Sequence, residues 1–390
     1  MSVNRTVDPL IDDEYVGDPP SKRLLAYLLG RREQGAKIVG AYCGYAPVEI
    51  IRALGLVPAS LCAVSNATIE VAEAVLPANL CSLIKSSYGF ILKDACPFFA
   101  MSDAVIAETT CDGKKKMFEL IADRKPMHVM DLPQLPDEPE AVDNWTVMIR
   151  KLQRFLESVF GRVATDQDIE SAIRDTNEKS RLMNRVFDYA ALKPPVIGWA
   201  ELYELFQLGQ SLSGAQMRPI LNGVIEKLEK RKKDGYAHGA HGAPRVMVTG
   251  CPVGGDLLKV LDIIEESGGV IVALDSCSGL KPYATFIEEG TGDPVRAIAA
   301  RYLQIPCSCM TPNERRLTEI DRIVERFKPD AVVDLILHAC HSYTIESFKV
   351  EGHLRQRHGL PFLKIITDFS QSDTGQIRTR VQALLEICMQ

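Results

Sequence analysis

Two stretches of this chain alternate short apolar runs with amphipathic segments, and this alternation limits the folds that are available to it. Parallel strands need a crossover connection, usually a helix, so the pattern is typical of parallel sheets with helices on both faces. The sequence therefore predicts an α/β fold with two Rossmann-like parallel-sheet domains. The expected strands are residues 38–42, 56–61, 103–111 and 127–133 in the first stretch, and residues 245–250, 270–276, 330–339 and 361–368 in the second.

A helical pattern separates the two stretches. It runs from Trp145 to about Lys233 and has long charged faces such as LNGVIEKLEKRKKDG. The acidic, proline-rich segment QLPDEPEAVDN precedes it and the glycine-rich segment GYAHGAHGAPR follows it, and both compositions are typical of connections. We therefore expect an N-terminal helix and first α/β domain in residues 1–140, a helical segment and linker in residues 141–240, and a second α/β domain in residues 241–390.

Composition and charge exclude several classes of protein. The chain has 390 residues, of which 46% are hydrophobic and 25% charged, as is usual for a globular protein. Its net charge of −6 argues against nucleic acid as the main partner, because phosphate binding needs a basic face. No apolar run reaches the about 18 residues of a membrane span, and the N-terminal MSVNRTVDPLIDDEY lacks the apolar core of a signal peptide. We therefore expect a cytoplasmic protein.

Eleven cysteines are the unusual part of the composition. A reducing cytoplasm makes disulfides unexpected, and the lack of a CxxC pair disfavours zinc ribbons, thioredoxin chemistry and ferredoxin-type clusters. Two interpretations are left: buried thiols, or a cluster whose ligands lie far apart in the sequence. Seven cysteines fall at the carboxyl ends of expected strands or in the first turn of an expected helix, where open α/β sheets bind ligands. They are Cys43, Cys62, Cys81, Cys111, Cys251, Cys277 and Cys340.

A free cysteine is often a small buried hydrophobe, and for any single member of this set that interpretation is as good as a ligand role. It explains the whole set less well, because Cys111 beside Asp112-Gly113 and Cys340 between two histidines lie in polar turns. Soft thiolates at wide spacing suit an iron–sulfur cluster better than they suit zinc.

The other cysteines are placed differently. Cys96 precedes the strand that Cys111 ends, so these two residues are roughly 20 Å apart and one small cluster cannot take both. We therefore expect Cys96 to be structural, and also Cys388 in the last helix. Cys307 and Cys309 lie in the loop IPCSCMTPN, which could reach the same edge of the sheet.

Other candidate functional residues carry weaker signals. His338 and His341 flank Cys340 and could donate a hydrogen bond to sulfur or pass a proton, although a structural role explains each of them slightly better. Glu49 begins a helix behind Cys43, where an acid is common for dipole reasons alone. The GKKKM run is expected to be a solvated helix face, or else a docking patch for an acidic partner. Neither GxGxxG nor a P-loop is present, which argues against NAD or ATP binding by this chain.

Five segments together resemble the 2-hydroxyacyl-CoA dehydratase and benzoyl-CoA reductase superfamily. They are CGYAPVEIIRALGLVP, NLCSLIKSSYGF, ETTCDGKKKM, HACHSYTIES and TDFSQSDTGQIRTRVQALLE. The resemblance implies that three cysteines, matching Cys81, Cys111 and Cys340, hold one [4Fe-4S] cluster between two α/β domains. It also implies a partner, an ATP-hydrolysing Fe–S activator protein that supplies low-potential electrons. Asp112-Gly113 is then expected to form the turn that brings backbone N–H groups close to the sulfurs.

The chain is richer in cysteine than the dehydratases, and LPANLCSLIKSSYGF, VTGCPVGGD and QIPCSCMTPN resemble the double-cubane cluster proteins more closely. That branch holds an [8Fe-9S] cluster with six cysteines of one subunit. The resemblance therefore implies three further ligands, for which we predict Cys43, Cys277 and Cys307, since the second cubane should lie in the cleft between the domains. Cys309, Cys251 and Cys62 are the reserve candidates.

The resemblance leads us to expect an iron–sulfur reductase that passes electrons to a small molecule. The alternatives are a [4Fe-4S] (R)-2-hydroxyacyl-CoA dehydratase subunit and a non-catalytic electron carrier. A homodimer is expected from the same resemblance.

Overall fold

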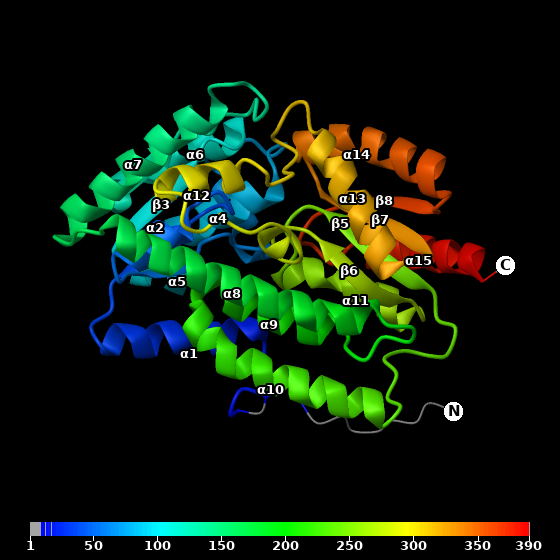
Figure 1. Ribbon diagram of the computed structural model, residues 1–390. Coiled ribbons are helices and arrows are strands. Elements are labelled where there is room, and N and C mark those ends of the chain that lie inside the picture. Colours follow the sequence, from blue (N-terminus) through cyan, green and yellow to red (C-terminus); the bar gives the residue numbers. More distant parts are fainter. Residues whose placement is uncertain (1–8, 12, 17, 390) are drawn as a thin grey trace.

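The computed structural model describes residues 9–11, 13–16 and 18–389. Within them lie two four-stranded parallel sheets with the strand orders β2-β1-β3-β4 and β6-β5-β7-β8 (Figure 1). This arrangement confirms the predicted α/β class with two Rossmann-like units. The strands are β1 (Ile38–Ala41), β2 (Val57–Ser60), β3 (Ala104–Glu108), β4 (Met127–Met130), β5 (Arg245–Gly250), β6 (Val270–Asp275), β7 (Ala331–Leu337) and β8 (Phe362–Thr367).

Helices cover the faces of both sheets, because each inner strand is buried along its whole length and needs apolar neighbours on either side. The first sheet carries α2 (Val48–Ala53), α3 (Ile69–Glu73), α4 (Ser82–Leu92), α5 (Pro97–Met101) and α6 (Asp112–Ile121). The strands of the second sheet alternate along the chain with α11 (Lys259–Glu266), α12 (Pro294–Tyr302), α13 (Glu314–Phe327), α14 (His341–His353) and α15 (Thr374–Cys388).

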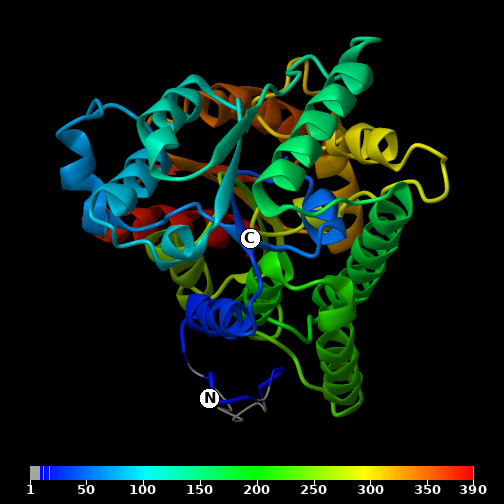
Figure 2. The ribbon, with the colours of Figure 1, turned by 90° about the vertical axis from the view of Figure 1, so that its left-hand side faces the viewer.

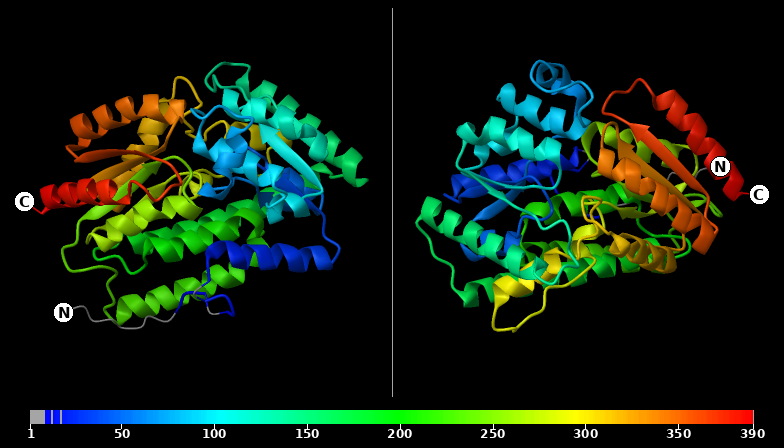
Figure 3. Two further views of the ribbon diagram at one scale, coloured as in Figure 1. Left: turned by 180° about the vertical axis from the view of Figure 1, so that it is seen from behind. Right: turned by 90° about the horizontal axis from the view of Figure 1, so that it is seen from above.

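The predicted helical segment forms four helices, of which three lie below the two sheets together with the N-terminal α1 (Pro20–Glu33) (Figures 1 and 3). Two of these helices begin with capping boxes, Thr165 with Asp168 and Ser213 with Gln216, in which each side chain bonds the other residue's backbone N–H. None of the helices in the described ranges is long and apolar enough to cross a membrane. The helices are α7 (Ala141–Phe160), α8 (Asp166–Ala191), α9 (Trp199–Ser211) and α10 (Gly214–Lys233).

One helix from the C-terminal part of the chain packs in the N-terminal core. Figures 2 and 3 show α12, in yellow, beside α7 and away from the sheet formed by β5–β8. Its residues Val295 and Ile298 are fully buried in the cluster that contains Trp145 and Ile50. The segment around α12 therefore connects the two sheet units through a shared core.

The strand orders determine where a ligand can bind. In both parallel sheets the strand order reverses between the two inner strands, which are β1 and β3 in the first sheet and β5 and β7 in the second. Such a reversal opens a crevice at the carboxyl ends of these strands. A cysteine follows each of these four strands: Cys43, Cys111, Cys251 and Cys340.

Candidate functional site

The first thiol group consists of Cys81, Cys251 and Cys340, which come from both sheet units. The thiols of Cys251 and Cys81 donate hydrogen bonds to Cys340, and this holds the pKa of Cys340 well below its usual range. The bond to Cys340, followed by burial, raises the pKa of Cys81, and burial raises that of Cys251. One thiolate therefore lies between two neutral thiols, and a thiolate is the form of cysteine that binds soft metals.

Three cysteines occupy the same position relative to a helix. Cys81, Cys111 and Cys340 are the N-cap residues of α4, α6 and α14. Cys111 is exposed at the surface, yet partial desolvation of its thiol raises its pKa, whereas the backbone N–H of Lys114 in the first turn of α6 lowers it. The equivalent N–H groups of Ile84 and Tyr343 act in the same direction on Cys81 and Cys340.

Two local expectations are corrected here. The helix expected near Asn79 begins at Ser82, so Cys81 precedes the helix and is not in its first turn. Asp112 and Gly113 are the first residues of α6 and do not form a turn. Backbone N–H groups still face the thiol, but they are those of a helix terminus.

The second thiol group consists of Cys43, Cys277, Cys307 and Cys309. A hydrogen bond from Cys309 lowers the pKa of Cys307 to about 6, and the nearby Lys281 acts in the same direction. Burial is the largest of the effects that raise the pKa of Cys43, and the neighbouring Cys277 and Cys307 raise it further. This group thus has the same character as the first, with one acidic thiol among neutral ones.

The two thiol groups are held next to each other. Ser308, beside Cys307, donates from its hydroxyl to Ser342 Oγ at 3.2 Å in the first turn of α14. Asn313 Nδ2 donates to the carbonyl of Cys307 at 2.9 Å and so holds the loop in place. The thiols of Cys340 and Cys307 both raise the pKa of Cys111, which lies close to each thiol group.

Lys114 points into the site, and the predicted solvated face is wrong for this lysine. Its Nζ donates to the Tyr42 carbonyl at 2.9 Å and lies 3.8 Å from Cys62 Sγ. Burial opposes its positive charge, but the neighbouring thiols, Cys62 and Cys43 first, raise its pKa. Lys115 and Lys116 are exposed and pair with Asp112 and Glu119, as a solvated face requires.

Lys281 supplies a second buried positive charge. It is 3% exposed, and its Nζ lies 3.1 Å from the Tyr343 hydroxyl and 4.0 Å from Asp275 Oδ1. Arg316 and Thr249 donate hydrogen bonds to the other oxygen of Asp275, so this carboxylate stays ionised. Two lysines therefore offset the negative charge that thiolates bring to the site.

Glu108 ends β3 beside Lys114 and is 0% exposed. Neither of its carboxylate oxygens has a hydrogen-bond partner among the described residues. Burial raises its pKa to about 8, and Lys114 opposes this shift only partly. Glu108 therefore holds a proton at neutral pH next to the second thiol group.

The other predicted candidates lie at different depths. Glu49 is 1% exposed and accepts a hydrogen bond from the Tyr302 hydroxyl at 2.9 Å, which gives it a packing role between α2 and α12. His338 and His341 are exposed on either side of Cys340. Cys96 and Cys388 lie outside both thiol groups; Cys96 accepts a hydrogen bond from the Phe99 backbone, and Cys388 donates to the Leu384 carbonyl.

A cavity of about 530 Å³ opens beside the second thiol group. Cys43, Cys62 and Cys277 line it together with Lys114 and Lys281, and its far wall comes from the helical segment with Tyr203 and Phe206. Its size is that of a site for a small molecule.

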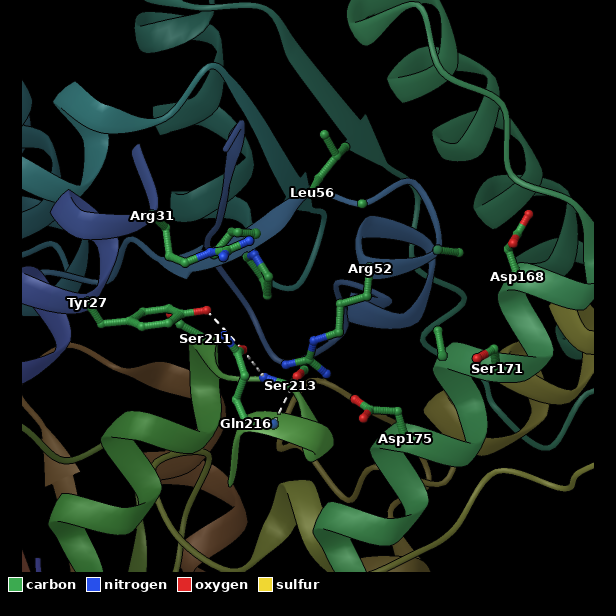
Figure 4. A pocket seen from close by; sticks show the side chains of 15 residues that line it. Tyr27, Arg31, Arg52, Leu56, Asp168, Ser171, Asp175, Ser211, Ser213 and Gln216 are labelled. Atoms are coloured by element: carbon green, nitrogen blue, oxygen red, sulfur yellow. Dashed lines mark hydrogen bonds between the residues drawn. The ribbon is translucent and has the colours of Figure 1, made fainter. Parts of the chain in front are cut away.

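A second cavity, of about 420 Å³, lies near the start of β2 between α1, α8 and the connection from α9 to α10 (Figure 4). Arg52 lines both cavities, while Arg31 and the buried Ser211 line only the second. No cysteine is among the residues that line it, so it is separate from the thiol groups.

The donor set fits an iron–sulfur cluster. Both groups offer sulfur, each contains one acidic thiol, and two buried cations and three helix N-termini face them. Sulfur donors arranged in this way suit a soft cluster better than a hard cation.

Comparison with known proteins agrees with this architecture. Residues 43–388 match the family model described as 2-hydroxyglutaryl-CoA dehydratase, D-component. The chain belongs to this dehydratase family. A relative in Escherichia coli K12, a putative dehydratase subunit named YjiM, is 41% identical over 91% of this chain and 92% of its own length.

More distant members of the dehydratase family also align with this chain. The (R)-phenyllactyl-CoA dehydratase beta subunit of Clostridium sporogenes is 22% identical over 92% of this chain and 94% of its own length. A subunit of the benzoyl-CoA reductase of Thauera aromatica is 23% identical over 68% of each chain. The family thus contains both dehydratase and reductase subunits, which supports an enzymatic role for this chain.

Two residues of the site were missed from the sequence although a signal for each exists. Lys114 is in helical phase with the buried Met117, Phe118 and Ile121, which predicts an inward direction that Lys115 and Lys116 do not share. Glu108 ends a strand in which all the other residues are apolar, and such strands are buried on both faces.

Proposed function

We propose that this protein is an iron–sulfur reductase in which six cysteines from the two sheet units hold a double-cubane [8Fe-9S] cluster. It would receive low-potential electrons from an ATP-hydrolysing Fe–S partner and reduce a small molecule. One observation carries the proposal: cysteines from both sheet units are brought together, since Cys81 is hydrogen-bonded to Cys340 and Cys43 lies near Cys277 and Cys307.

The proposed ligands of the first cubane are Cys81, Cys111 and Cys340, because each is a helix N-cap residue. Those of the second are Cys43, Cys277 and Cys307. Cys251 is a reserve ligand because its thiol is hydrogen-bonded to Cys340. Cys309 and Cys62 are the other reserves, next to Cys307 and Lys114 respectively.

The bound cluster would supply electron storage at low potential. The chain's own part is to exclude water and to offset negative charge with Lys114 and Lys281. Glu108 keeps a proton on its carboxyl group at neutral pH, close to Cys43. The adjoining cavity of about 530 Å³ is the proposed place for the small-molecule substrate.

The second candidate function is a [4Fe-4S] dehydratase subunit that acts on a (R)-2-hydroxyacyl-CoA. The names of the relatives favour it, since YjiM is described as a putative dehydratase subunit. The relatives are also named as subunits, which supports a partner protein and is compatible with the proposed homodimer. A non-catalytic electron carrier is the third candidate, and it predicts no substrate-dependent ATP turnover with the reductase.

Anaerobic purification followed by iron and sulfide analysis tests the proposal. A double cubane requires about eight irons per chain, whereas about four would support the dehydratase and overturn the double cubane. A chain without iron would contradict both. The variants Cys43→Ser and Cys307→Ser should lower iron content to about half, while Cys388→Ser is the matched control that should leave it unchanged.

A further inference from the structure

A second group of metal-binding side chains lies on the outer side of the C-terminal sheet unit. Asp321 comes from the middle of α13, His353 ends α14, and His358 ends the turn that follows. Both imidazole Nε2 atoms lie 2.6 Å from the same oxygen, Asp321 Oδ1. The three side chains are 14–17% exposed, so they are largely shielded from solvent yet reachable from it.

An irregular helical turn brings the two histidines together. His353 and His358 are five residues apart, and in a continuous α-helix this spacing would turn the two side chains about 140° away from each other. Residues Leu354–His358 instead form a π-helical turn, with i to i+5 hydrogen bonding, which places His358 over His353. π-helical turns are rare and occur frequently at functional sites, which agrees with a role for the two histidines beyond packing.

Hydrogen bonds alone would fix the tautomer of both histidines. For both histidines to donate to Asp321 Oδ1, both must carry their proton on Nε2, and one oxygen then accepts two imidazoles. Arg357 Nε approaches the other oxygen at 3.3 Å, which favours the ionised carboxylate. Two neutral imidazoles and one carboxylate are the usual donor set for zinc and related divalent ions.

We propose that Asp321, His353 and His358 bind one divalent transition-metal ion, with Zn²⁺ the preferred occupant. The nitrogen and oxygen donors suit zinc, and the exposed side leaves a fourth position for water. Metal–ligand bonds of about 2.0–2.1 Å in tetrahedral geometry put the ligand atoms about 3.3 Å apart, so the three side chains must separate by less than ~1 Å.

This metal site is separate from the thiol groups. Cys340 lies at the N-terminus of α14 and His353 at its C-terminus, and 13 residues at about 1.5 Å each give roughly 20 Å of helix between them. The ion would connect α13 to the end of α14 and to the turn that leads into β8. Its role is therefore to stabilise this side of the unit and not to take part in electron transfer.

Zinc analysis of the anaerobically purified, iron-loaded protein tests the proposal. After equilibrium dialysis against Zn²⁺, the wild type should retain one more zinc ion per chain than His358→Gln or His353→Gln. Zinc should also raise the unfolding temperature of the wild type but not of these variants. Two variants are needed because either one alone could disturb the packing of the π-helical turn.

His238→Gln is the matched control. His238 is hydrogen-bonded to Glu265 at 2.8 Å and is similarly shielded, but no third ligand joins this pair among the residues that the structure describes. This variant should keep the wild-type zinc content. Anomalous diffraction at the zinc edge should then show a peak between Asp321, His353 and His358. Equal zinc content in the wild type and both histidine variants, or no peak at this position, would overturn the proposal.

Discussion

Glu108 is a buried carboxyl group without a hydrogen-bond partner among the described residues, and this makes the stability of the protein depend on pH. Burial raises its pKa from 4.5 to about 8. Between these two values the folded form keeps the proton that the unfolded form loses, so stability falls as the pH rises through this window.

Glu108→Gln should remove that loss. The variant should gain on the wild type from pH 5 to pH 9, by up to about 5 kcal/mol since each unit of pKa shift corresponds to about 1.36 kcal/mol. Denaturant unfolding across this pH range measures the difference. Glu119→Gln, which changes an exposed glutamate of α6, should show no such trend. An equal trend in both variants would show that Glu108 is not the group responsible.

Lys114 offers a second test on the scale of a single residue. Its ammonium group lies among Cys62, Cys43 and Cys111 and lowers the pKa values of the last two. Lys114→Met should therefore weaken iron retention, so that a chelator removes iron several-fold faster, while Lys114→Arg should restore most of the retention. Lys115→Met changes the exposed neighbour and should have no effect. Loss of retention in Lys115→Met as well would contradict the proposed role of Lys114.

The elements that support the thiols include one strained connection. Ala339 joins β7 to Cys340 with a φ of 60°, in the left-handed region that residues with a side chain rarely adopt. In the connection that follows β5, the residue before Cys251 is Gly250, with a φ of 119°. A residue with a positive φ thus lies directly before the cysteine that follows β5 and before the one that follows β7. At Ala339 this conformation carries a steric cost.

Ala339→Gly should remove this cost and stabilise the protein by about 1 kcal/mol. The unfolding midpoint in denaturant measures the effect. Ala331→Gly, at the start of the preceding strand β7, is the matched control, and it should destabilise the protein because glycine there loses conformational freedom and packing without relieving strain. A lower midpoint for Ala339→Gly would show that the loop is not strained.

Much of the architecture could be predicted at the level of elements, because short apolar strands and amphipathic helices alternate regularly. That pattern placed Cys43, Cys111, Cys251 and Cys340 at strand ends, where they are found. It could not predict the direction of Lys114, because charge alone indicates solvent and only the packing of α6 turns this residue inward. It also could not predict the π-helical turn at 354–358, whose sequence LRQRH is compatible with an ordinary helix.

At the scale of the whole molecule, α12 connects the two sheet units. It follows β6 along the chain but packs beside α2 and α7, so local sequence patterns could not place it. Hydrogen bonds hold α12 and the residues after it to the N-terminal unit: Tyr302 donates to Glu49 and accepts from the Val48 backbone N–H, and Tyr45 donates to the Ile305 carbonyl at 3.0 Å. The loop that follows α12 carries Cys307 and Cys309, so this contact also positions the second thiol group.

Tyr302→Phe tests this connection. It removes the hydroxyl that bonds the buried Glu49, and an unsatisfied buried acceptor costs about 1–3 kcal/mol. Hydrogen exchange should then increase in α2, in α12 and in the loop with Cys307 together, because they form one packed unit. Tyr189→Phe is the matched control, since its partner Glu229, at 2.5 Å, is partly exposed and can bond water instead. Faster exchange confined to α12 would mean that the helix is not the connection between the two units.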